Sequence, residues 1–365
     1  MLEKINFNDL DKSKLESFRF DEIAKRVAEG VDPNTTTLEK YVGLEHIDAE
    51  NIHIKRFGSP DDVSGGKLKC YSGDVIFGKR RAYQRKAAIV DFEGICSAHA
   101  FVFRANQEVI DPRLFPFFLH SDQFMHRAVD ISVGGLSPTI NWGDLKYQEF
   151  LIPPKEDQAR LLELLWAMDE VIESEKKLII TLKKYMRSYF ISNYKKWKSN
   201  NRVRLGDVTN AKQWKTISKN ELTEDGYLVY GGNGIIGKYT EYNHEKSTIA
   251  IACRGEYCGN VHYTLPKSYV TGNSMCLDNL DELKFKSKFL FYYLKYTDLT
   301  PVISGSAQPQ IIKQDLENYK INEISLKTQD EVILKMDLIY NSIEKINAKI
   351  CASLSLQKSI INHFF

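Results

Sequence analysis

The sequence lacks the features that mark membrane proteins and disulfide-bonded secreted proteins. No run of about 18 apolar residues occurs in the chain, so we expect no transmembrane helix. The opening stretch MLEKINFNDLDKSK is charged and has no apolar signal core, which favours a cytoplasmic protein. The six cysteines form no C-x-x-C pair and have no histidines at zinc spacing. We therefore expect reduced thiols and no metal site.

Signatures of common enzymes are also missing. The chain has no P-loop, no G-x-S-x-G, no H-E-x-x-H, and no N-P-P-[YF] stretch of an amine methyltransferase. Gly232, Gly234 and Gly237 fit the spacing of a dinucleotide-binding loop, but the following KYTEYNH does not begin a helix. The sequence therefore predicts a chain without a catalytic centre or a bound cofactor of its own.

The composition is sufficient for two or three domains with substantial cores. Hydrophobic residues make up 43% and aromatic residues 12% of the 365 residues. The formal net charge is only +2. Binding to nucleic acid would therefore require positive charge that is concentrated in one part of the chain.

An internal repeat is the strongest signal in the sequence. SPTINWGDLKYQEFLIPPKEDQ at 137–158 matches QPQIIKQDLENYKINEISLKTQ at 308–329 at a constant offset of 171 residues. The matched pairs are Pro138 and Pro309, Ile140 and Ile311, Asp144 and Asp315, Leu145 and Leu316, and Gln158 and Gln329. A stretch of small residues precedes each block. We therefore predict a duplication of one structural unit.

A heptad pattern follows each copy of this block. Apolar residues recur in steps of four and three, which is typical of a coiled-coil seam rather than an ordinary amphipathic helix. The first seam comprises Leu161, Leu165, Met168, Ile172, Ile179, Leu182 and Met186, and the second comprises Val332, Met336, Ile339, Ile343, Ile346 and Ile350. Each helix would contain about 33 residues and be roughly 50 Å long. Neither seam can be buried alone, but the two can bury each other.

The rest of each half predicts a compact α+β domain. The runs VIFG, AAIVDF and AFVFRA in the first half, and GYLVYG, TIAIAC and NVHYTL in the second, predict strands. LFPFFLHSDQFMHRAV and FKSKFLFYYLKYT predict helices with bulky apolar faces. The repeat extends weakly into this part, because GDVIFGKRR at 73–81 is similar to STIAIACRG at 247–255.

The clearest chemical signal is the basic stretch FGKRRAYQRKAAIV at 77–90, which predicts a hairpin between two apolar strands. Lysine and arginine can contact phosphates, and arginine and glutamine can contact base edges. A solvated basic turn without a ligand is the alternative. The candidate DNA-binding residues of the first half are Lys79, Arg80, Arg81, Tyr83, Gln84, Arg85 and Lys86, with Ser137 and Thr139 from the repeated block.

The second half has fewer charges at the matching place and more glycine, amide and aromatic residues. Such residues allow the backbone and short side chains to approach bases closely. Its candidate DNA-binding residues are Tyr230, Gly232, Asn233, Lys238, Tyr239, Arg254, Tyr257, Asn273, Ser306, Gln308 and Gln310. Different loop chemistry on one fold predicts that the two halves recognise different sequences.

The order of these motifs resembles that of type I restriction–modification specificity subunits. The resemblance covers nearly all of the chain and is carried by GDVIFGKRR, YGGNGIIGKY, GNSMCLDN and SGSAQPQIIKQDLENYKI, with GGLSPTINWGDLKYQEFLIPPKEDQ as the parallel stretch of the first copy. It implies two target-recognition domains with mixed β-sheets and short helices, separated by an intramolecular antiparallel coiled coil. Each domain would read one half of a bipartite, asymmetric DNA site, and the coil length would set the unread spacer.

The resemblance also implies boundaries and partners. We expect an N-terminal segment (1–19), a first recognition domain (20–155), a central coiled-coil helix (156–198), a second recognition domain (199–325) and a C-terminal coiled-coil helix (326–365). The expected partners are double-stranded DNA, two methyltransferase (modification) subunits that dock on the coil, and motor–nuclease (restriction) subunits. S-adenosylmethionine, ATP and Mg²⁺ would be bound by these subunits and not by this chain.

Three other interpretations remain open. The specificity chain of a related combined system, which cuts on both sides of its site, would have a similar sequence. A coiled-coil adaptor that does not bind DNA would share the two seams. A stand-alone enzyme with a duplicated fold would need a catalytic cluster, and the sequence offers none. Salt-dependent DNA affinity and co-purification with an adenine methyltransferase would separate the specificity subunit from the adaptor.

Overall fold

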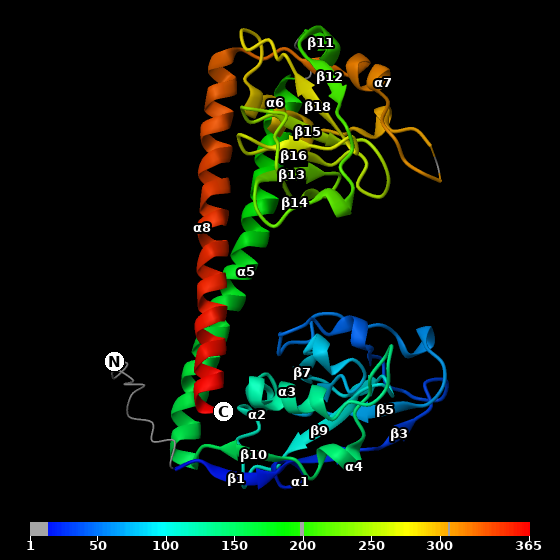
Figure 1. The fold of residues 1–365 in the computed structure, drawn as a ribbon, viewed down its shortest axis with the longest axis vertical. Coiled ribbons are helices and arrows are strands. Elements are labelled where there is room, and N and C mark those ends of the chain that lie inside the picture. The colour runs from blue at the N-terminus through cyan, green and yellow to red at the C-terminus, as the bar shows by residue number, and fades with distance from the viewer. Residues whose placement is uncertain (1–13, 198–200, 306) are drawn as a thin grey trace. The chain divides into compact units, whose positions relative to one another are not determined.

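The computed structural model of the protein describes residues 14–197, 201–305 and 307–365 (Figure 1). The chain divides into two compact units. Unit 1 comprises the residues up to Glu175 together with Lys349–Phe365, and unit 2 comprises Lys176–Ala348. Residues 1–13 of the predicted N-terminal segment, residue 198 of the predicted central helix and Ser306 lie outside the described residues. Within the described ranges, no helix has an apolar stretch of bilayer length.

Unit 1 combines short helices with two four-stranded sheets and a two-stranded sheet. Its strands are β1 (Glu16–Arg19), β2 (Ala24–Val27), β3 (Gly30–Val31), β4 (Tyr41–Val42), β5 (Lys67–Cys70), β6 (Val75–Phe77), β7 (Ala87–Ile89), β8 (Gly94–Cys96), β9 (Phe101–Ala105) and β10 (Glu149–Ile152). Its short helices are α1 (Phe20–Ile23), α2 (Phe115–Leu119), α3 (Asp122–Asp130) and α4 (Trp142–Leu145), with the 3₁₀ turns η3 (Leu44–His46), η4 (Pro60–Asp62) and η5 (Ala82–Gln84).

Unit 2 is built from the same kinds of element. Its strands are β11 (Arg202–Arg204), β12 (Asn210–Gln213), β13 (Tyr227–Gly231), β14 (Gly234–Tyr239), β15 (Ile249–Ala252), β16 (Val261–Tyr263), β17 (Tyr269–Val270), β18 (Ser274–Asp278) and β19 (Lys320–Asn322). Its short helices are α6 (Ser287–Tyr296) and α7 (Lys313–Asn318), with the 3₁₀ turns η6 (Leu205–Asp207), η7 (Lys219–Glu221) and η8 (Thr300–Val302).

The main sheet has the same strand order in both units. The order is β2-β9-β6-β7 in unit 1 and β12-β18-β15-β16 in unit 2, and neighbouring strands are antiparallel. The register is equivalent as well, because Ile76 pairs with Val102 and, 174 residues further along, Ala250 pairs with Cys276. The small sheets β1–β10 and β11–β19 also correspond. The structure thus confirms the predicted duplication of an α+β unit.

The second sheet differs between the units. In unit 1 its order is β3-β5-β8-β4, and in unit 2 it is β14-β13-β17. Each of these sheets contains one parallel pair, β4 with β8 and β13 with β17, so the sheets are mixed as predicted. In unit 2, β14 is an edge strand of this sheet and pairs with β13 as an antiparallel hairpin. The glycine-rich stretch 231–237 forms the turn of this hairpin and part of its second strand, and no helix follows it.

The predicted helix at 114–129 is two helices in the structure. The first, α2, ends at Leu119, and α3 begins at Asp122. The Oγ of Ser121 accepts a hydrogen bond from the backbone N–H of Phe124 at 3.2 Å, so this serine is the N-cap of α3. A polar residue that can cap a new helix therefore interrupts a run whose apolar spacing favours one continuous helix.

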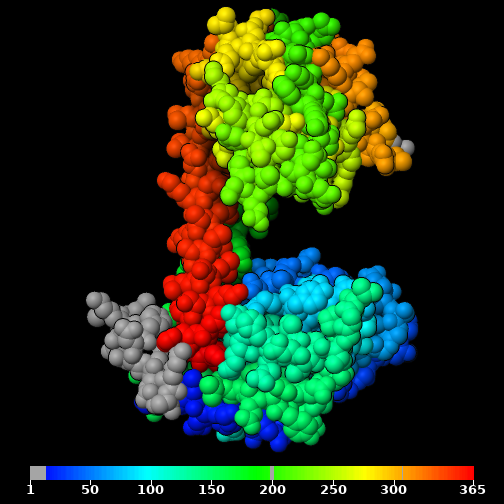
Figure 2. Space-filling view, in the orientation of Figure 1, coloured from blue at the N-terminus to red at the C-terminus, as the bar shows by residue number. Residues whose placement is uncertain are grey.

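Aromatic side chains fill the core of unit 1. The ring centre of Phe20 lies 4.9 Å from that of Phe103 and 5.4 Å from that of Phe124, at distances typical of edge-to-face and tilted pairs. The ring centre of Phe118 lies 5.3 Å from that of Phe365. The last residue of the chain therefore belongs to the core of unit 1, and Figure 2 shows the red end of the C-terminal helix packed against this unit.

A buried glutamine fixes the beginning of the long helix in each unit. In unit 1 the Oε1 of Gln158 accepts from the N–H of Asp111 at 2.8 Å, and its Nε2 donates to the carbonyls of Val109 and Pro153 at 2.7 and 2.9 Å. Gln329 makes the same three bonds in unit 2. The two glutamines occupy matching positions of the sequence repeat, but the sequence alone does not show what they do. In the structure, each side chain satisfies three backbone groups that would otherwise be unpaired.

Two long helices carry the heptad seams, α5 (Lys155–Trp197) and α8 (Leu326–Phe364). In unit 1 the start of α5 packs antiparallel to the end of α8, since Gln357 donates to the carbonyl of Leu165 at 3.2 Å and Lys349 pairs with Glu175. In unit 2 the ammonium of Lys335 on α8 lies 5.8 Å from the ring centre of Tyr185 on α5. Each unit therefore contains one end of a helix pair.

The seam residues face inward in both helices. Ten are buried, namely Leu161, Leu165, Ile172, Ile179, Met186, Val332, Met336, Ile339, Ile343 and Ile350. Three are half-buried, namely Met168, Leu182 and Ile346. Buried and half-buried seam residues thus recur in steps of three and four along both helices, as a coiled-coil seam requires.

Candidate nucleic-acid interface

In unit 1 the basic stretch meets the loop that precedes the repeated block. Strands β6 and β7 pair as an antiparallel hairpin, and the basic residues lie in the connection between them. Thr139 bridges to Val133 and to Arg80, which closes loop 133–139 and joins it to this connection. The N–H of Arg81 donates to the carbonyl of Pro138 at 2.8 Å. The two predicted parts of the first site are therefore adjacent in the structure.

The outer side of this junction presents arginine, hydroxyl, aromatic and apolar groups. The guanidinium of Arg81 donates to the Oγ of Ser137 at 3.0 and 3.2 Å. Tyr83 is 54% exposed, and Leu136 at the tip of loop 133–139 is 98% exposed. Sequence analysis did not select Leu136. A single leucine flanked by glycine and serine is the sequence signal that could have identified the tip of the loop.

Three other cations of the basic stretch, Lys79, Arg85 and Lys86, point into unit 1. Lys86 donates to the carbonyl of Leu44 at 2.6 Å. The ammonium of Lys79 lies 5.1 Å from the ring centre of Phe101, and burial lowers the pKa of this lysine. Gln84 is half-buried in η5. Part of the charge of this predicted hairpin therefore serves the packing of unit 1.

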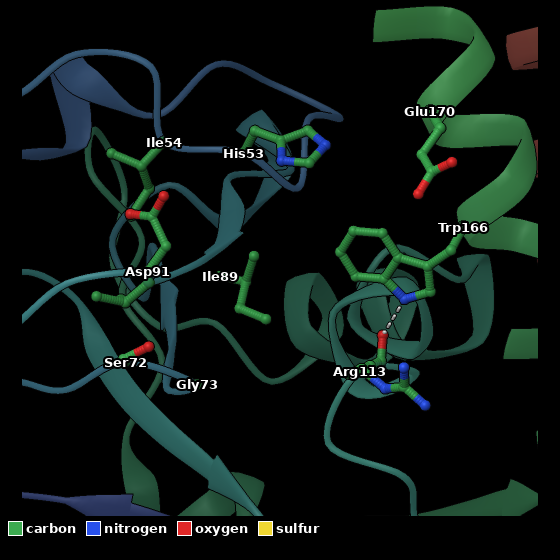
Figure 3. A pocket seen from close by; sticks show the side chains of 10 residues that line it. His53, Ile54, Ser72, Gly73, Ile89, Asp91, Arg113, Trp166 and Glu170 are labelled. Atoms are coloured by element: carbon green, nitrogen blue, oxygen red, sulfur yellow. Dashed lines mark hydrogen bonds between the residues drawn. The ribbon is translucent and has the colours of Figure 1, made fainter.

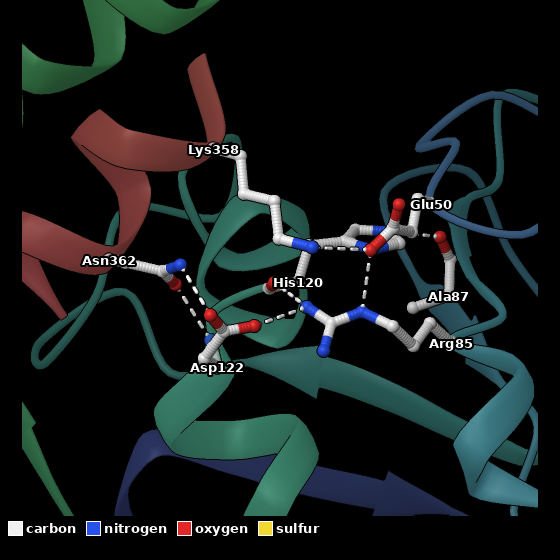
Figure 4. Close-up of polar contacts among 7 residues, drawn as sticks. All are labelled: Glu50, Arg85, Ala87, His120, Asp122, Lys358 and Asn362. Atoms are coloured by element: carbon white, nitrogen blue, oxygen red, sulfur yellow. Dashed lines mark hydrogen bonds and ion pairs between the residues drawn. The ribbon is translucent and has the colours of Figure 1, made fainter. Parts of the chain in front are cut away.

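Arg85 is the clearest case of an inward-facing cation (Figure 4). Its guanidinium forms ion pairs with Glu50 at 2.9 Å and with Asp122 at 3.0 Å, and donates to the carbonyl of His120 at 2.7 Å. Lys358 on α8 pairs with the same Glu50 at 2.8 Å. Arg85 thus joins the hairpin to α3 and to the C-terminal helix. Contact with DNA would require these bonds to break, so we no longer include Arg85 and Lys86 among the proposed DNA contacts.

Unit 2 repeats the same junction with different side chains. Gln310 bridges to Ser304 and to Arg254, as Thr139 does to Val133 and Arg80. The N–H of Gly255 donates to the carbonyl of Pro309 at 3.0 Å, which reproduces the bond between Arg81 and Pro138. The matched glycines at 134 and 305 both have positive φ, 112° and 83°. A common loop geometry therefore positions both sets of predicted residues.

Most predicted residues of the second site lie on the surface around this junction. The exposed ones are Arg254, Tyr257, Asn273, Gln308 and Gln310. The N–H of Cys253, next to Arg254, donates to the carbonyl of Asn273 at 3.0 Å, so the strand-end loops lie together. Gly232 packs near Tyr257, because a Cβ at this glycine would lie 3.9 Å from the Cβ of Tyr257. Asn233 is exposed at the same turn.

Three predicted residues lie elsewhere. Tyr230 is buried at 6% exposure, and its hydroxyl accepts from the N–H of Leu265 at 3.1 Å, so it is a core residue and its assignment to the interface is wrong. Lys238 and Tyr239 lie at the opposite end of the β13–β14 hairpin, beside Thr223. The hairpin separates residues that the sequence places in one glycine-rich loop.

Polar bonds fix α5 to the domain of unit 1 along a hollow of about 540 Å³ (Figure 3). The indole N–H of Trp166 donates to the carbonyl of Arg113 at 3.1 Å, and the Nε2 of His53 pairs with Asp169 at 2.6 Å. Asp91 and Glu170 line the same hollow as Arg113. Among the described residues, none of the predicted DNA-binding positions lines it. These bonds set the position of the helix relative to the sheets of unit 1.

Comparison with known proteins identifies the family to which this fold belongs. The family model described as the type I restriction modification DNA specificity domain matches the chain twice, at residues 34–184 and 195–354. The chain belongs to this family. Its two matches coincide with the two copies of the structural repeat, and they confirm the resemblance that the sequence motifs indicate.

Individual members of the type I specificity family are moderately similar in sequence. A putative type I specificity subunit of Mycoplasma pneumoniae (strain ATCC 29342 / M129 / Subtype 1) is 30% identical over 167 residues, which cover 44% of each chain. The EcoprrI specificity subunit of Escherichia coli is 26% identical over 171 residues, which cover 45% of this chain and 42% of that one. The chain thus spans about half the length of the curated relatives it matches.

Solved structures of the family share the fold. The crystal structure of a type I restriction–modification S subunit from M. genitalium has a TM-score of 0.61 and 18% identity, and the alignment covers 100% of this chain and 98% of that one. A chain from a study of complex assembly and conformational transition of the type I system has a TM-score of 0.58 and 20% identity, covering 96% and 97%. The likeness extends over both units.

Proposed function

We propose that this chain is the non-catalytic DNA-binding specificity subunit of a type I restriction–modification complex, and that each unit reads one half of a bipartite, asymmetric site. The observation that carries this proposal is the matched loop junction. The backbone bonds around Thr139 and Gln310 are equivalent, whereas the exposed side chains differ. One scaffold with two sets of exposed groups suits the recognition of two unlike half-sites.

The side chains at each junction have the chemistry that base recognition requires. In unit 1, Arg80 and Arg81 can each donate two parallel hydrogen bonds to a guanine edge or contact phosphates. In unit 2, Asn273, Gln308 and Gln310 carry amides that suit an adenine edge. Arg254 adds the positive charge that favours phosphate contact. These residues therefore form the proposed readout set, in place of the longer list that the sequence predicts.

The long helices are proposed to set the spacing of the half-sites. Helix α5 has 43 residues and runs without interruption from unit 1 into unit 2. At 1.5 Å per residue, removal of one heptad from both helices shortens the pair by about 10 Å. This equals about three base pairs of B-form DNA. We expect the permitted spacer to shorten by that amount, and an unchanged spacer would contradict this role of the helices.

The same helices offer surfaces for other subunits. In unit 2, Leu178 and Ile180 of α5 and Leu334 and Leu338 of α8 are large apolar side chains that remain exposed. Exposed apolar side chains on helices are typical of surfaces that bind another protein. We propose that two methyltransferase subunits dock on the helix pair, and that motor–nuclease subunits join them. S-adenosylmethionine, ATP and Mg²⁺ would be bound by those subunits, which would supply adenine methylation and DNA cleavage.

Mapping of methylated adenines tests this proposal. The chain is co-expressed with the methyltransferase subunit of its own system, and the methylated positions in host DNA are sequenced. The expected result is two different short sequences separated by a fixed number of unread base pairs. Methylation at one continuous sequence would contradict the assignment of one half-site to each unit.

A direct binding measurement separates the specificity subunit from the coiled-coil adaptor. We expect the affinity for a DNA duplex to fall steeply as the salt concentration rises, because phosphate contacts release counterions. An adaptor would show no such affinity. The related combined system predicts the same binding, and differs by cleavage on both sides of the site once its partner subunits are added.

A further inference from the structure

Three side chains of metal-binding type come together in unit 2, away from the loop junction. They are His244, in the loop before β15, and Cys276 and Asp278 on β18. One potential ligand atom of each lies within 4.8 Å of the others. Cys276 and Asp278 are two residues apart on one strand, so their side chains project from the same face of the sheet.

The hydrogen bonds around His244 determine which of its ring nitrogens carries a proton. Asn243 donates through Nδ2 to the carbonyl of Val270 at 3.0 Å and accepts through Oδ1 from the N–H of the same residue at 2.9 Å. Both ends of the amide are therefore assigned by the backbone. The Oδ1 of Asn243 also lies 2.6 Å from the Nδ1 of His244. Because this oxygen can only accept, Nδ1 must carry a hydrogen.

The other ring nitrogen then faces a carboxylate. The Nε2 of His244 lies 3.0 Å from an oxygen of Asp278. In a neutral imidazole with its hydrogen on Nδ1, Nε2 presents a lone pair, and two lone pairs at this distance repel each other. The contact is stable only if a positively charged species lies between Nε2 and the carboxylate oxygen or is bound to one of them. A proton on Nε2 would serve, and so would a metal ion.

We propose that His244, Cys276 and Asp278 bind a divalent transition metal ion of the zinc class in unit 2. Imidazole nitrogen, thiolate sulfur and carboxylate oxygen are the ligands that Zn²⁺ takes in proteins. A histidine ligand usually donates its second ring N–H to a neighbouring acceptor, which fixes the ring, and Asn243 has this position here. The sulfur of Cys276 is what favours a metal ion over a proton, because a proton shared by His244 and Asp278 needs no third group.

The residues around the proposed site leave room for a metal ion to enter, and a bound ion would connect two segments of unit 2. His244 and Asp278 line a hollow of about 560 Å³ that also contains Lys212 and Trp214, so an ion and a water ligand can enter. The ring of Trp214 packs against that of His244 at 5.5 Å. A bound ion would tie the loop before β15 to β18. Arg254 follows β15, and Asn273 directly precedes β18.

Among the described residues of unit 1, no cluster of this kind occurs. At the matching register positions β9 carries Val102 and Arg104, and Arg104 forms an ion pair with Asp74 at 2.7 Å. The sequence analysis predicted no metal site, because His244 and Cys276 are far apart in the chain and only the sheet brings them together. Metal binding would therefore distinguish unit 2 from its repeat.

Cobalt titration of the full chain tests the proposal. The background carries Cys258→Ser and Cys351→Ser, which remove the thiols that are not fully buried. We expect one equivalent of Co²⁺ to bind with the near-ultraviolet absorption of a cobalt–thiolate bond, and Zn²⁺ to displace it. We also expect Zn²⁺ to raise the melting temperature, since an ion that binds the folded state stabilises it.

Two variants identify the ligands. Cys276→Ser should remove the cobalt–thiolate absorption, whereas Cys253→Ser, which removes another buried thiol of unit 2, should keep it. Asp278→Asn lies at a strand end and should weaken Co²⁺ binding at least tenfold while the chain stays folded. The proposal is overturned if the background protein binds no Co²⁺ with thiolate absorption, or if the absorption persists in Cys276→Ser.

Discussion

Units 1 and 2 share the strand order of the main sheet but hold the end of a long helix by different chemistry. In unit 1 the end of α8 is held by the ion pair of Lys358 with Glu50 and by Phe365 against Phe118. In unit 2 the end of α5 is held by aromatic rings, with Phe190 and Tyr194 packed on Tyr293 at 6.2 and 5.6 Å between ring centres. The repeat has kept the backbone arrangement and replaced the side chains that stabilise it.

The features that both units share differ in kind from those that occur in only one unit. The glutamine bonds at the helix starts, the main-sheet register and the bridges at the loop junction occur in both units. All of these depend on backbone geometry or on one matched side chain. The ion pairs of Arg85 and Lys358, the identities of the exposed loop residues and the proposed metal ligands are not repeated between the units. Backbone bonds thus define the scaffold, and side chains give each copy its own properties.

The largest expected effect comes from the matched seam positions Ile172 and Ile343. Both are buried, so Ile172→Asp and Ile343→Asp each place an unpaired charge in the helix interface. We expect each substitution to lower the free energy of unfolding by about 4 kcal/mol or more. Urea denaturation followed by circular dichroism measures this. Leu338→Asp on the exposed side of α8 is the control and should cost little. If only one of the two substitutions lowered the free energy of unfolding strongly, the two seams would not be equivalent.

A pH dependence is expected in unit 1 because His120 is buried. Burial holds the pKa of His120 at about 4, compared with 6.5 for an exposed histidine, and its Nε2 donates to the carbonyl of Ala87 at 2.8 Å. The unfolded chain therefore takes up the proton first as the pH falls. The stability contributed by neutral His120 is fully present above about pH 6.5 and is lost toward pH 4, on the order of 3 kcal/mol.

Calorimetry at pH 7 and pH 5 checks this dependence. The variant His120→Gln keeps a side-chain N–H but does not titrate, so its stability should change less between the two values. The nearby charged groups are Arg85, Glu50 and Lys358. Unit 2 also contains a histidine whose pKa is lowered by burial, His262, so the comparison of wild type with His120→Gln isolates the contribution of unit 1. An equal pH response in wild type and His120→Gln would assign the effect to other groups.

The buried glutamines give a smaller effect that should be the same in both units. Gln158→Met and Gln329→Met preserve volume but leave backbone groups at the helix start without partners. We expect a loss of about 2–3 kcal/mol for each variant. Hydrogen exchange read by mass spectrometry should show faster exchange in the affected unit alone. If one variant were neutral, its unit would have another way to satisfy these groups.

The smallest effect is expected for Lys358→Met. This removes one ion pair with Glu50, whose side chain is about half exposed. Exposed pairs contribute about 0–1 kcal/mol, and salt screens them. Phe190→Ala in unit 2 should cost more and should not depend on salt, because it removes a buried ring. A salt-independent loss in Lys358→Met would mean that packing of its aliphatic chain matters more than its charge.

The sequence predicted the repeat, the seams, the hairpin and the family, because these depend on local spacing and on matches between two copies. It could not predict that Arg85 and Lys86 face inward, since their partners Glu50, Asp122 and Leu44 are about 35 to 42 residues away. Nor could it separate Tyr230 from Asn233, because the hairpin turn that divides core from surface depends on strand pairing. Long-range contacts decided each of these cases.

The central claim is that each unit reads a different half-site through its own loop junction. The most direct test compares Arg80→Ala with Arg254→Ala in a methylation assay on a library of degenerate sites. We expect each variant to relax recognition of one half-site by about 1–3 kcal/mol, with the other half-site unchanged and the affected halves different. Relaxation of the same half-site by both variants, or of neither, would contradict the claim.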